Sequence, residues 1–215
     1  MRGGVVRTSR VLSRVLWSVV WLGWVGSAQA GVFNTARTLK PTASSLAVAT
    51  EVGIVQEGGS EVSLSPDVNL FYGVGVVRGV DFQLRAGFPL AGQWNGPCLG
   101  GDVEVGLLSD GRVRPAVSLT VGGHVVGWQY GGLDGTLMVS KVLGRMEPYV
   151  ALDTDVDVVG GAGVAKVMMV GGVDVHLARR AEMLVEVGRR TSRVSGDVGG
   201  YVSVGFNFYL AASGY

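Results

Sequence analysis

The chain has 215 residues, of which 47% are hydrophobic and 16% charged, with 18 basic and 17 acidic side chains. This length suits a single domain, and the absence of a basic excess argues against a nucleic-acid-binding protein. The one cysteine, Cys98, excludes an internal disulfide framework and any CxxC metal site, and we interpret it as incidental.

Residues 1–30 have the pattern of a secretory signal peptide. A start containing four arginines precedes the apolar run 15–25, and Ala28-Gln29-Ala30 is a small-x-small cleavage site. The apolar run is too short for a spanning helix, which needs about 20 residues. We therefore expect cleavage after Ala30. Cleavage removes four of the 18 basic side chains and none of the 17 acidic ones, which leaves a net charge of −3.

Residues 31–45 are polar and contain Pro41, and we expect them to form a periplasmic lead-in. No later apolar run approaches the length of a transmembrane helix, so a closed barrel is the only membrane-spanning fold that remains. Ten strand-like runs follow the lead-in. They lie near residues 46–56, 63–74, 79–88, 102–109, 112–121, 133–142, 148–157, 164–176, 181–190 and 198–210.

The third run shows the strand pattern most clearly. Apolar Val80, Phe82 and Leu84 alternate with Asp81, Gln83 and Arg85, so one face is apolar and the other polar. That alternation is typical of a β-strand between an apolar and an aqueous medium. The eighth run departs from it, because residues 167–170 are all apolar. Either that strand slips by one residue or its lumen side is locally dry.

The connections suggest long loops after odd-numbered runs and short turns after even-numbered runs, as in small outer-membrane barrels. Residues 89–101 and 122–132 are the longest of the expected loops. Aromatic belts are expected at both rims. The outer belt would hold Phe88, Trp128 and Tyr130, and the periplasmic belt Tyr72, Tyr149, Phe206 and Phe208.

The leader, the lead-in residues 34–41 and the amphipathic run 201–210 resemble those of small bacterial outer-membrane β-barrel proteins. In that broad class the last residue is often aromatic, as Tyr215 is, although residues 211–214 break the alternation before it. The resemblance implies a Gram-negative outer-membrane location, with lipid, lipopolysaccharide and the barrel-assembly machinery as partners.

We predict an all-β fold, a closed antiparallel up-and-down transmembrane barrel of ten strands, or eight, over residues 46–215. A soluble secreted β-sandwich or lipocalin-like binding protein is the alternative fold. It would show the same alternation with its apolar faces turned inward.

Charged side chains on the polar faces are expected to form a structural ion-pair network in the lumen. We predict pairs between Arg85 and Glu104 and between Asp155 and Lys166, because unpaired charges are costly to bury. Small barrels are filled by their own side chains, which favours a structural lumen over a narrow passive pore for small solutes. The predicted network comprises Asp81, Arg85, Glu104, Arg114, Asp155, Lys166, Glu186 and Arg190.

Metal binding and catalysis are not expected. Asp153, Asp155 and Asp157 begin like a calcium loop, but the glycine and the final glutamate of that motif are missing, so we predict a solvated acidic rim. The two histidines, His124 and His176, are placed in the third long loop and at the opposite end of the barrel. No GxSxG or HExxH motif accompanies them, and we predict neither an enzyme nor a cofactor.

The predicted role is structural, or an interaction at the cell surface. The second and third long loops would carry any contact with an extracellular partner, because loops on a rigid scaffold commonly bind partners. Trp94, Trp128 and Tyr130 are the candidate contact residues.

Overall fold

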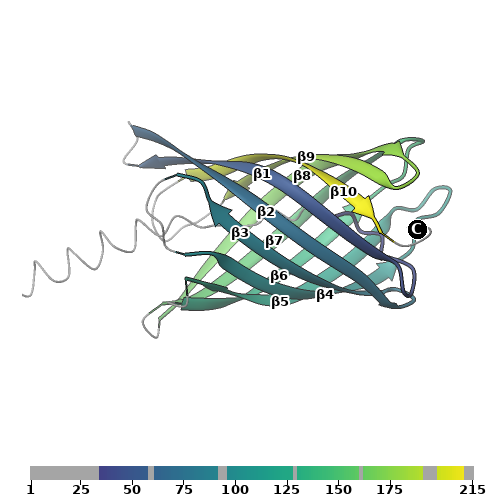
Figure 1. Ribbon diagram of the computed structural model, residues 1–215, viewed down its shortest axis with the longest axis horizontal. Helices are drawn as coiled ribbons and strands as arrows, with labels where there is room; N and C mark the ends of the chain where they lie inside the picture. The colour runs from purple at the N-terminus through teal and green to yellow at the C-terminus, as the bar shows by residue number, and fades with distance from the viewer. Residues whose placement is uncertain are drawn as a thin grey trace, which may run out of the picture.

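The computed structural model describes residues 34–57, 61–91, 96–127, 130–159, 162–190 and 198–210. These residues form ten antiparallel strands, each paired with its neighbours in sequence, and pairing of the last strand with the first closes the barrel (Figure 1). The predicted all-β, up-and-down barrel is confirmed, with ten strands rather than eight. The strands are β1 (Ser44–Glu57), β2 (Glu61–Val77), β3 (Val80–Pro89), β4 (Cys98–Leu108), β5 (Ala116–Val126), β6 (Tyr130–Ser140), β7 (Met146–Val159), β8 (Ala162–Ala178), β9 (Ala181–Arg190) and β10 (Val198–Tyr209).

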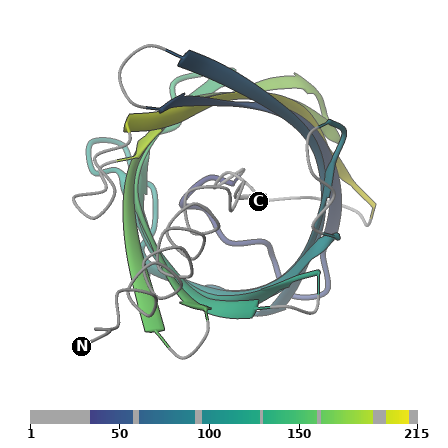
Figure 2. The same cartoon turned by 90° about the vertical axis from the view of Figure 1, so that its left-hand side faces the viewer.

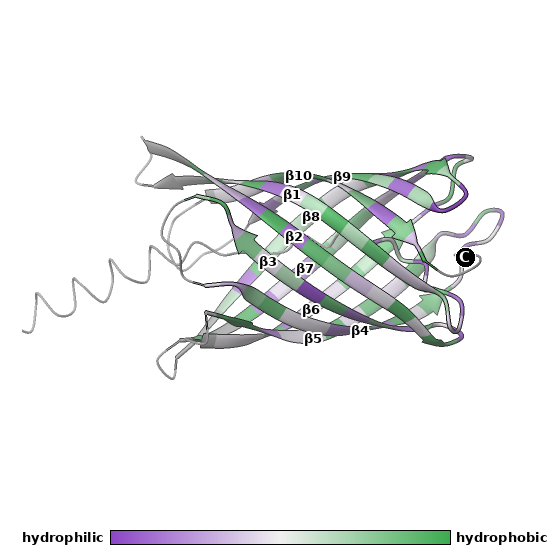
Figure 3. Ribbon diagram, viewed as in Figure 1, coloured by the Kyte–Doolittle hydropathy of each residue, from purple (hydrophilic) through white to green (hydrophobic). Residues whose placement is uncertain are grey.

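Apolar and polar residues alternate along the strands of the wall (Figure 3). On β3 the side chains of Phe82 and Leu84 are exposed on the outside, whereas Asp81 is buried inside. The same division holds along β1, β4, β9 and β10, as the alternation predicted. Among the described residues, no helix is long and apolar enough to cross a membrane.

The barrel is therefore apolar outside and charged inside, the reverse of a soluble protein. Leucines, valines and phenylalanines are exposed around the wall, far beyond the patches that soluble monomers tolerate. Such a surface is stable in contact with lipid, and this polarity is that of a transmembrane barrel. The soluble sandwich or lipocalin-like alternative required the apolar side chains inside, and it is wrong on this point.

Outward-facing aromatic side chains gather near the end of the barrel where β1 begins and β10 ends. Leu46 pairs in register with both Tyr72 and Phe208, and Phe206 lies two residues from Phe208 on the same exposed face. These positions agree with the predicted belt. Tyr149 does not belong to it, because its side chain is buried inside the barrel.

The predicted loop pattern is wrong in the middle of the chain. Residues 122–126 belong to β5 and residues 130–132 to β6, so the loop predicted at 122–132 shrinks to residues 127–129. On the opposite side, β4 and β5 are separated by residues 109–115 rather than by a two-residue turn. The glycines at 122, 123, 131 and 132, which fall in the predicted loop, instead lie within β5 and β6, where a missing side chain suits a tightly curved wall.

The eighth strand does not slip. Met168 and Val170 are buried inside the barrel while Met169 is exposed on the outside, so the lumen is locally dry at β8. These two side chains belong to an apolar cluster that also contains Ala151 and Leu184. Part of the barrel interior is therefore packed like a conventional core.

The outward orientation predicts a large cost for a charge in the middle of the wall. Val121 lies at the centre of β5 and is 58% exposed, so Val121→Arg is expected to lower the free energy of unfolding by about 2–4 kcal/mol. Val113, 89% exposed between β4 and β5, provides the matched control, and Val113→Arg should cost less than about 0.5 kcal/mol. Urea unfolding in phospholipid vesicles measures both values. Equal tolerance of the two substitutions would contradict a lipid-facing wall.

Candidate functional site in the barrel lumen

The inner wall is strongly acidic. Eleven carboxylate side chains are buried there, whereas no lysine or arginine among the described residues is buried to the same degree. A cleft lined by one sign of charge attracts ions of the other sign, so this lumen favours cations. The buried acids are Glu51, Asp67, Asp81, Asp102, Glu104, Asp134, Glu147, Asp155, Asp174, Glu182 and Glu186.

Residues 34–43 lie inside the barrel. In Figure 2 this segment, the start of the coloured chain, runs within the ring of strands. Thr35 is only 1% exposed, and Ala36 and Leu39 are also buried. We refer to residues 34–43 as the inner segment. The sequence suggested a periplasmic lead-in, and the structure places the described part of it in the lumen.

The inner segment is held by polar contacts to buried side chains of the wall. Two of the donors are backbone amides and two are side chains. These contacts therefore fix both the backbone path of the inner segment and the positions of two of its side chains. The contacts join Asn34 Nδ2 to Glu104 Oε2 at 2.6 Å, the Ala36 N–H to Ser140 Oγ at 3.2 Å, the Arg37 guanidinium to Glu147 Oε2 at 2.7 Å, and the Leu39 N–H to Asp81 Oδ2 at 2.5 Å.

A tight turn joins the inner segment to β1. The Ala43 N–H donates to the Lys40 carbonyl at 3.0 Å, and Thr42 adopts a positive φ of 68°. Gly75 of β2 exchanges two backbone hydrogen bonds of 2.9 Å with this turn. A Cβ at position 75 would lie 2.1 Å from the Lys40 carbonyl oxygen, so the turn can dock only against glycine.

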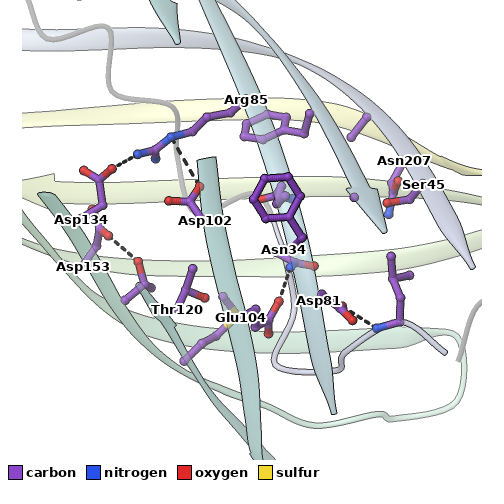
Figure 4. A pocket seen from close by; sticks show the side chains of 18 residues that line it. Asn34, Ser45, Asp81, Arg85, Asp102, Glu104, Thr120, Asp134, Asp153 and Asn207 are labelled. Carbon is purple, nitrogen blue, oxygen red and sulfur yellow. Dashed lines mark hydrogen bonds and ion pairs between the residues drawn. The ribbon is translucent and has the colours of Figure 1, made fainter. Parts of the chain in front are cut away.

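Arg85 is at the centre of an ion-pair cluster on the inner wall that joins β3, β4, β5 and β6 (Figure 4). Its Nε lies 3.5 Å from Asp102 Oδ2, and its terminal nitrogen pairs with Asp134 on β6. The Nδ1 atom of His124 lies 2.8 Å from the other oxygen of Asp134. A cation from β3 and an imidazole from β5 therefore share one carboxylate.

The predicted pair between Arg85 and Glu104 is wrong. The register of β3 and β4 places Glu104 opposite Asp81 and Gly100 opposite Arg85, and Asp102 is the diagonal neighbour of Arg85, two residues from Gly100. Glu104 instead accepts a hydrogen bond from Asn34 of the inner segment. In the observed register Glu104 lies four residues along β4 from the partner of Arg85, which is too far for the predicted pair.

The structure places the other predicted charges in different environments. Asp155 and Lys166 are register partners on β7 and β8, opposite one another as predicted. Arg114 is exposed in the connection before β5, so its assignment to the lumen is wrong, because β5 begins later than the sequence suggested. Arg190 ends β9, and its side chain lies outside the described residues.

Two further predictions change with the strand bounds. His124 lies within β5 and faces the lumen instead of occupying a long loop. Asp155 is buried, so it is not part of a solvated acidic rim, and Asp153 accepts a hydrogen bond of 2.5 Å from Thr136. The side chain of Asp157 lies outside the described residues, as do Trp94, Trp128 and the side chain of Tyr130.

Glu186 is fully buried, and its partners are tyrosines. The Tyr149 hydroxyl donates to Oε2 at 2.6 Å, and the Tyr201 hydroxyl donates to Oε1. Tyr201 lies opposite Gly188, where a Cβ would approach its ring to 2.0 Å. The alternation over residues 201–208 predicts that Tyr201 faces the lumen. Tyr149 was expected in an aromatic belt, so the sequence did not predict that the two tyrosines meet at Glu186.

A cavity of about 50 Å³ lies between the inner segment and the wall (Figure 4). Asn34 and Leu39 line it on one side, and Arg85, Asp102, Glu104 and Asp134 are among the wall residues that line it. The volume accommodates a few water molecules and no larger solute. This part of the lumen is a small, polar, water-sized chamber.

Comparison with known proteins identifies the class through the fold. The NanC porin superposes with a TM-score of 0.50 at 8% identity, covering 75% of this chain and 98% of the porin. Neisserial surface protein A gives a TM-score of 0.38 at 7% identity (77% and 96% covered), and OprG from Pseudomonas aeruginosa gives 0.40 at 10% (83% and 100% covered). No protein-family model matches the chain, and no curated protein matches it in sequence. The chain has the fold of the bacterial outer-membrane β-barrels.

Proposed function

We propose that the protein is a non-catalytic integral protein of the bacterial outer membrane whose lumen is closed by its own N-terminal segment. Its role is structural, or an interaction at the cell surface, rather than the passage of solutes. The docking of residues 34–43 against buried side chains of the wall carries this proposal. Lipid and lipopolysaccharide would cover the apolar wall, and the barrel-assembly machinery would insert it.

Three features support a closed barrel. The inner segment contacts β3, β4, β6 and β7, so it is fixed along a continuous arc of about half of the inner wall. Met138 and Leu184 are buried inside the wall, and Glu186 is sealed by two tyrosines. The cavity beside the inner segment accommodates only water-sized molecules. Together these features leave little room for a hydrated ion to pass.

The absence of catalysis is supported by how the lumen histidine is used. His124 is held against Asp134, whose second oxygen pairs with Arg85. His124 therefore takes part in an ion-pair cluster with Asp134 and Arg85, and this engagement supports a structural role for the imidazole.

Electrical recording tests the closed lumen. The folded, full-length barrel inserted into planar lipid bilayers is expected to show no steady single-channel conductance in molar potassium chloride. A difference in gel mobility between unheated and boiled samples should first establish that the barrel is folded. Regular conductance steps from the full-length protein would refute the closed-lumen proposal.

A narrow pore is the second candidate, and the acidic inner wall favours it. Eleven buried carboxylates would select cations once the inner segment had left the lumen. In this alternative the inner segment is a gate. Steps that reverse near the potassium equilibrium potential in a salt gradient would identify it.

A further inference from the structure

A second side-chain cluster lies apart from the Arg85 cluster, near the end of the barrel where the inner segment joins β1. Asp174 and His176 are two residues apart on β8 and share one face, and Glu182 of β9 is the register partner of His176. Each of the three offers a ligand atom, and these atoms all lie within 4.8 Å of one another.

Negative charge exceeds positive charge around this cluster. Asp174 and Glu182 are buried, and Glu147, fully buried, lies opposite Asp174 in register. Arg37 of the inner segment pairs with Glu147. His176 Nδ1 lies 2.7 Å from Glu182 Oε1, and the other oxygen of Glu182 accepts a hydrogen bond from the Tyr209 hydroxyl.

One atom of the cluster lacks a partner. Asp174 is 1% exposed; its carboxyl group lies within hydrogen-bonding reach of Glu182, and its Oδ1 has no hydrogen-bond partner among the described residues. A buried carboxylate oxygen without a donor is costly, and such atoms in folded proteins call for an explanation. A bound cation beside Asp174 would supply one.

The donor set identifies the kind of cation. One imidazole nitrogen and two carboxylate oxygens suit Zn²⁺, with water in the fourth tetrahedral position. Calcium and magnesium prefer sites made only of oxygen. The His176 side chain is 24% exposed, which gives the ion a path from the aqueous end.

We propose that Asp174, His176 and Glu182 form a divalent transition-metal site that takes Zn²⁺. On binding, the metal replaces the hydrogen bond between His176 Nδ1 and Glu182 Oε1, and the displaced proton leaves to solvent. The comparable group of His124, Asp134 and Asp155 is a weaker candidate, because Arg85 already neutralises Asp134.

Equilibrium dialysis tests the site. The folded, full-length barrel, freed of metal with a chelator, is dialysed against micromolar zinc sulfate, and bound zinc is measured by mass spectrometry. We expect one zinc per barrel, and at least a tenfold weaker affinity after Asp174→Asn or His176→Gln. His124→Gln is the matched control and should bind zinc as the unaltered protein does.

A spectroscopic measurement separates ligation from general attraction to the acidic lumen. Cobalt in place of zinc should give the visible absorption of a tetrahedral site, and His176→Gln should abolish it while the gel mobility shift of the folded barrel is kept. Failure to retain metal, unchanged binding by His176→Gln, or loss of binding by His124→Gln would each overturn the proposal.

Discussion

Replacement of Glu186 by alanine is expected to lower the free energy of unfolding of the barrel by about 3 kcal/mol. The fully buried carboxylate accepts hydrogen bonds from the hydroxyls of Tyr149 and Tyr201. Hydrogen bonds to charged groups contribute about 1.5–3 kcal/mol each, and alanine would leave both hydroxyls buried without an acceptor. Urea unfolding in lipid vesicles, followed by tryptophan fluorescence, measures the change.

A double-mutant cycle assigns the loss to these hydrogen bonds. With Tyr149 and Tyr201 both replaced by phenylalanine, the further change Glu186→Ala should cost much less, because no hydroxyl remains to be left unpaired. Glu186→Gln, which keeps one acceptor oxygen, should be intermediate. An equal cost of Glu186→Ala in both backgrounds would show that the tyrosines do not hold the carboxylate.

The direction of side chains could be predicted from sequence because it is a local property. Asp81, Glu104 and Glu186 each follow the two-residue period of their own strand, and that period alone decides which face they occupy. The partners of these side chains could not be predicted in the same way. Arg85 on β3 reaches Asp134 on β6, a contact that depends on the register of three strand pairs and on closure of the barrel.

Glycine was the main source of error in the strand bounds. Gly122 and Gly123 suggested a loop, yet they lie in β5, where Gly122 is opposite Asp134. A Cβ at position 122 would approach the carboxylate of Asp102 to 1.9 Å. Only glycine fits at this position, because the inward-facing Asp102 side chain fills the space beside it. To decide whether such a glycine belongs to a strand or to a loop, one must know which side chain lies beside it on the neighbouring strand.

The local sequence pattern could not predict that the inner segment lies in the lumen. Its polar residues and Pro41 indicate only an irregular connection. A signal was present in the charge balance, because the inward faces carry more acids than bases and Arg37 supplies one of the missing cations. The acidic composition of the inward strand faces therefore indicates that a basic side chain from elsewhere in the chain pairs with them, but it does not identify the segment that supplies it.

Reversal of the charge at position 37 is expected to release the inner segment and open the barrel to cations. Arg37 lies 2.7 Å from Glu147, which is fully buried, so Arg37→Glu would set two carboxylates against each other. At a separation of about 4 Å and a protein-like dielectric, like charges repel by roughly 4 kcal/mol. That repulsion is comparable to the free energy that the remaining hydrogen bonds contribute to holding the inner segment in the lumen.

Planar-bilayer recording and thiol labelling together measure this release. The Arg37→Glu barrel should show steady cation-selective steps, whereas Arg112→Glu, an equal charge change at an exposed position in the connection before β5, should stay silent. In a Cys98→Ser background, Thr35→Cys should react slowly with a maleimide in the otherwise unaltered barrel and at least tenfold faster with Arg37→Glu, because Thr35 is buried. If the thiol becomes accessible while the bilayer stays silent, wall side chains close the lumen and the inner segment is not its plug. If the thiol stays protected, the contact with Glu147 does not hold the segment in place.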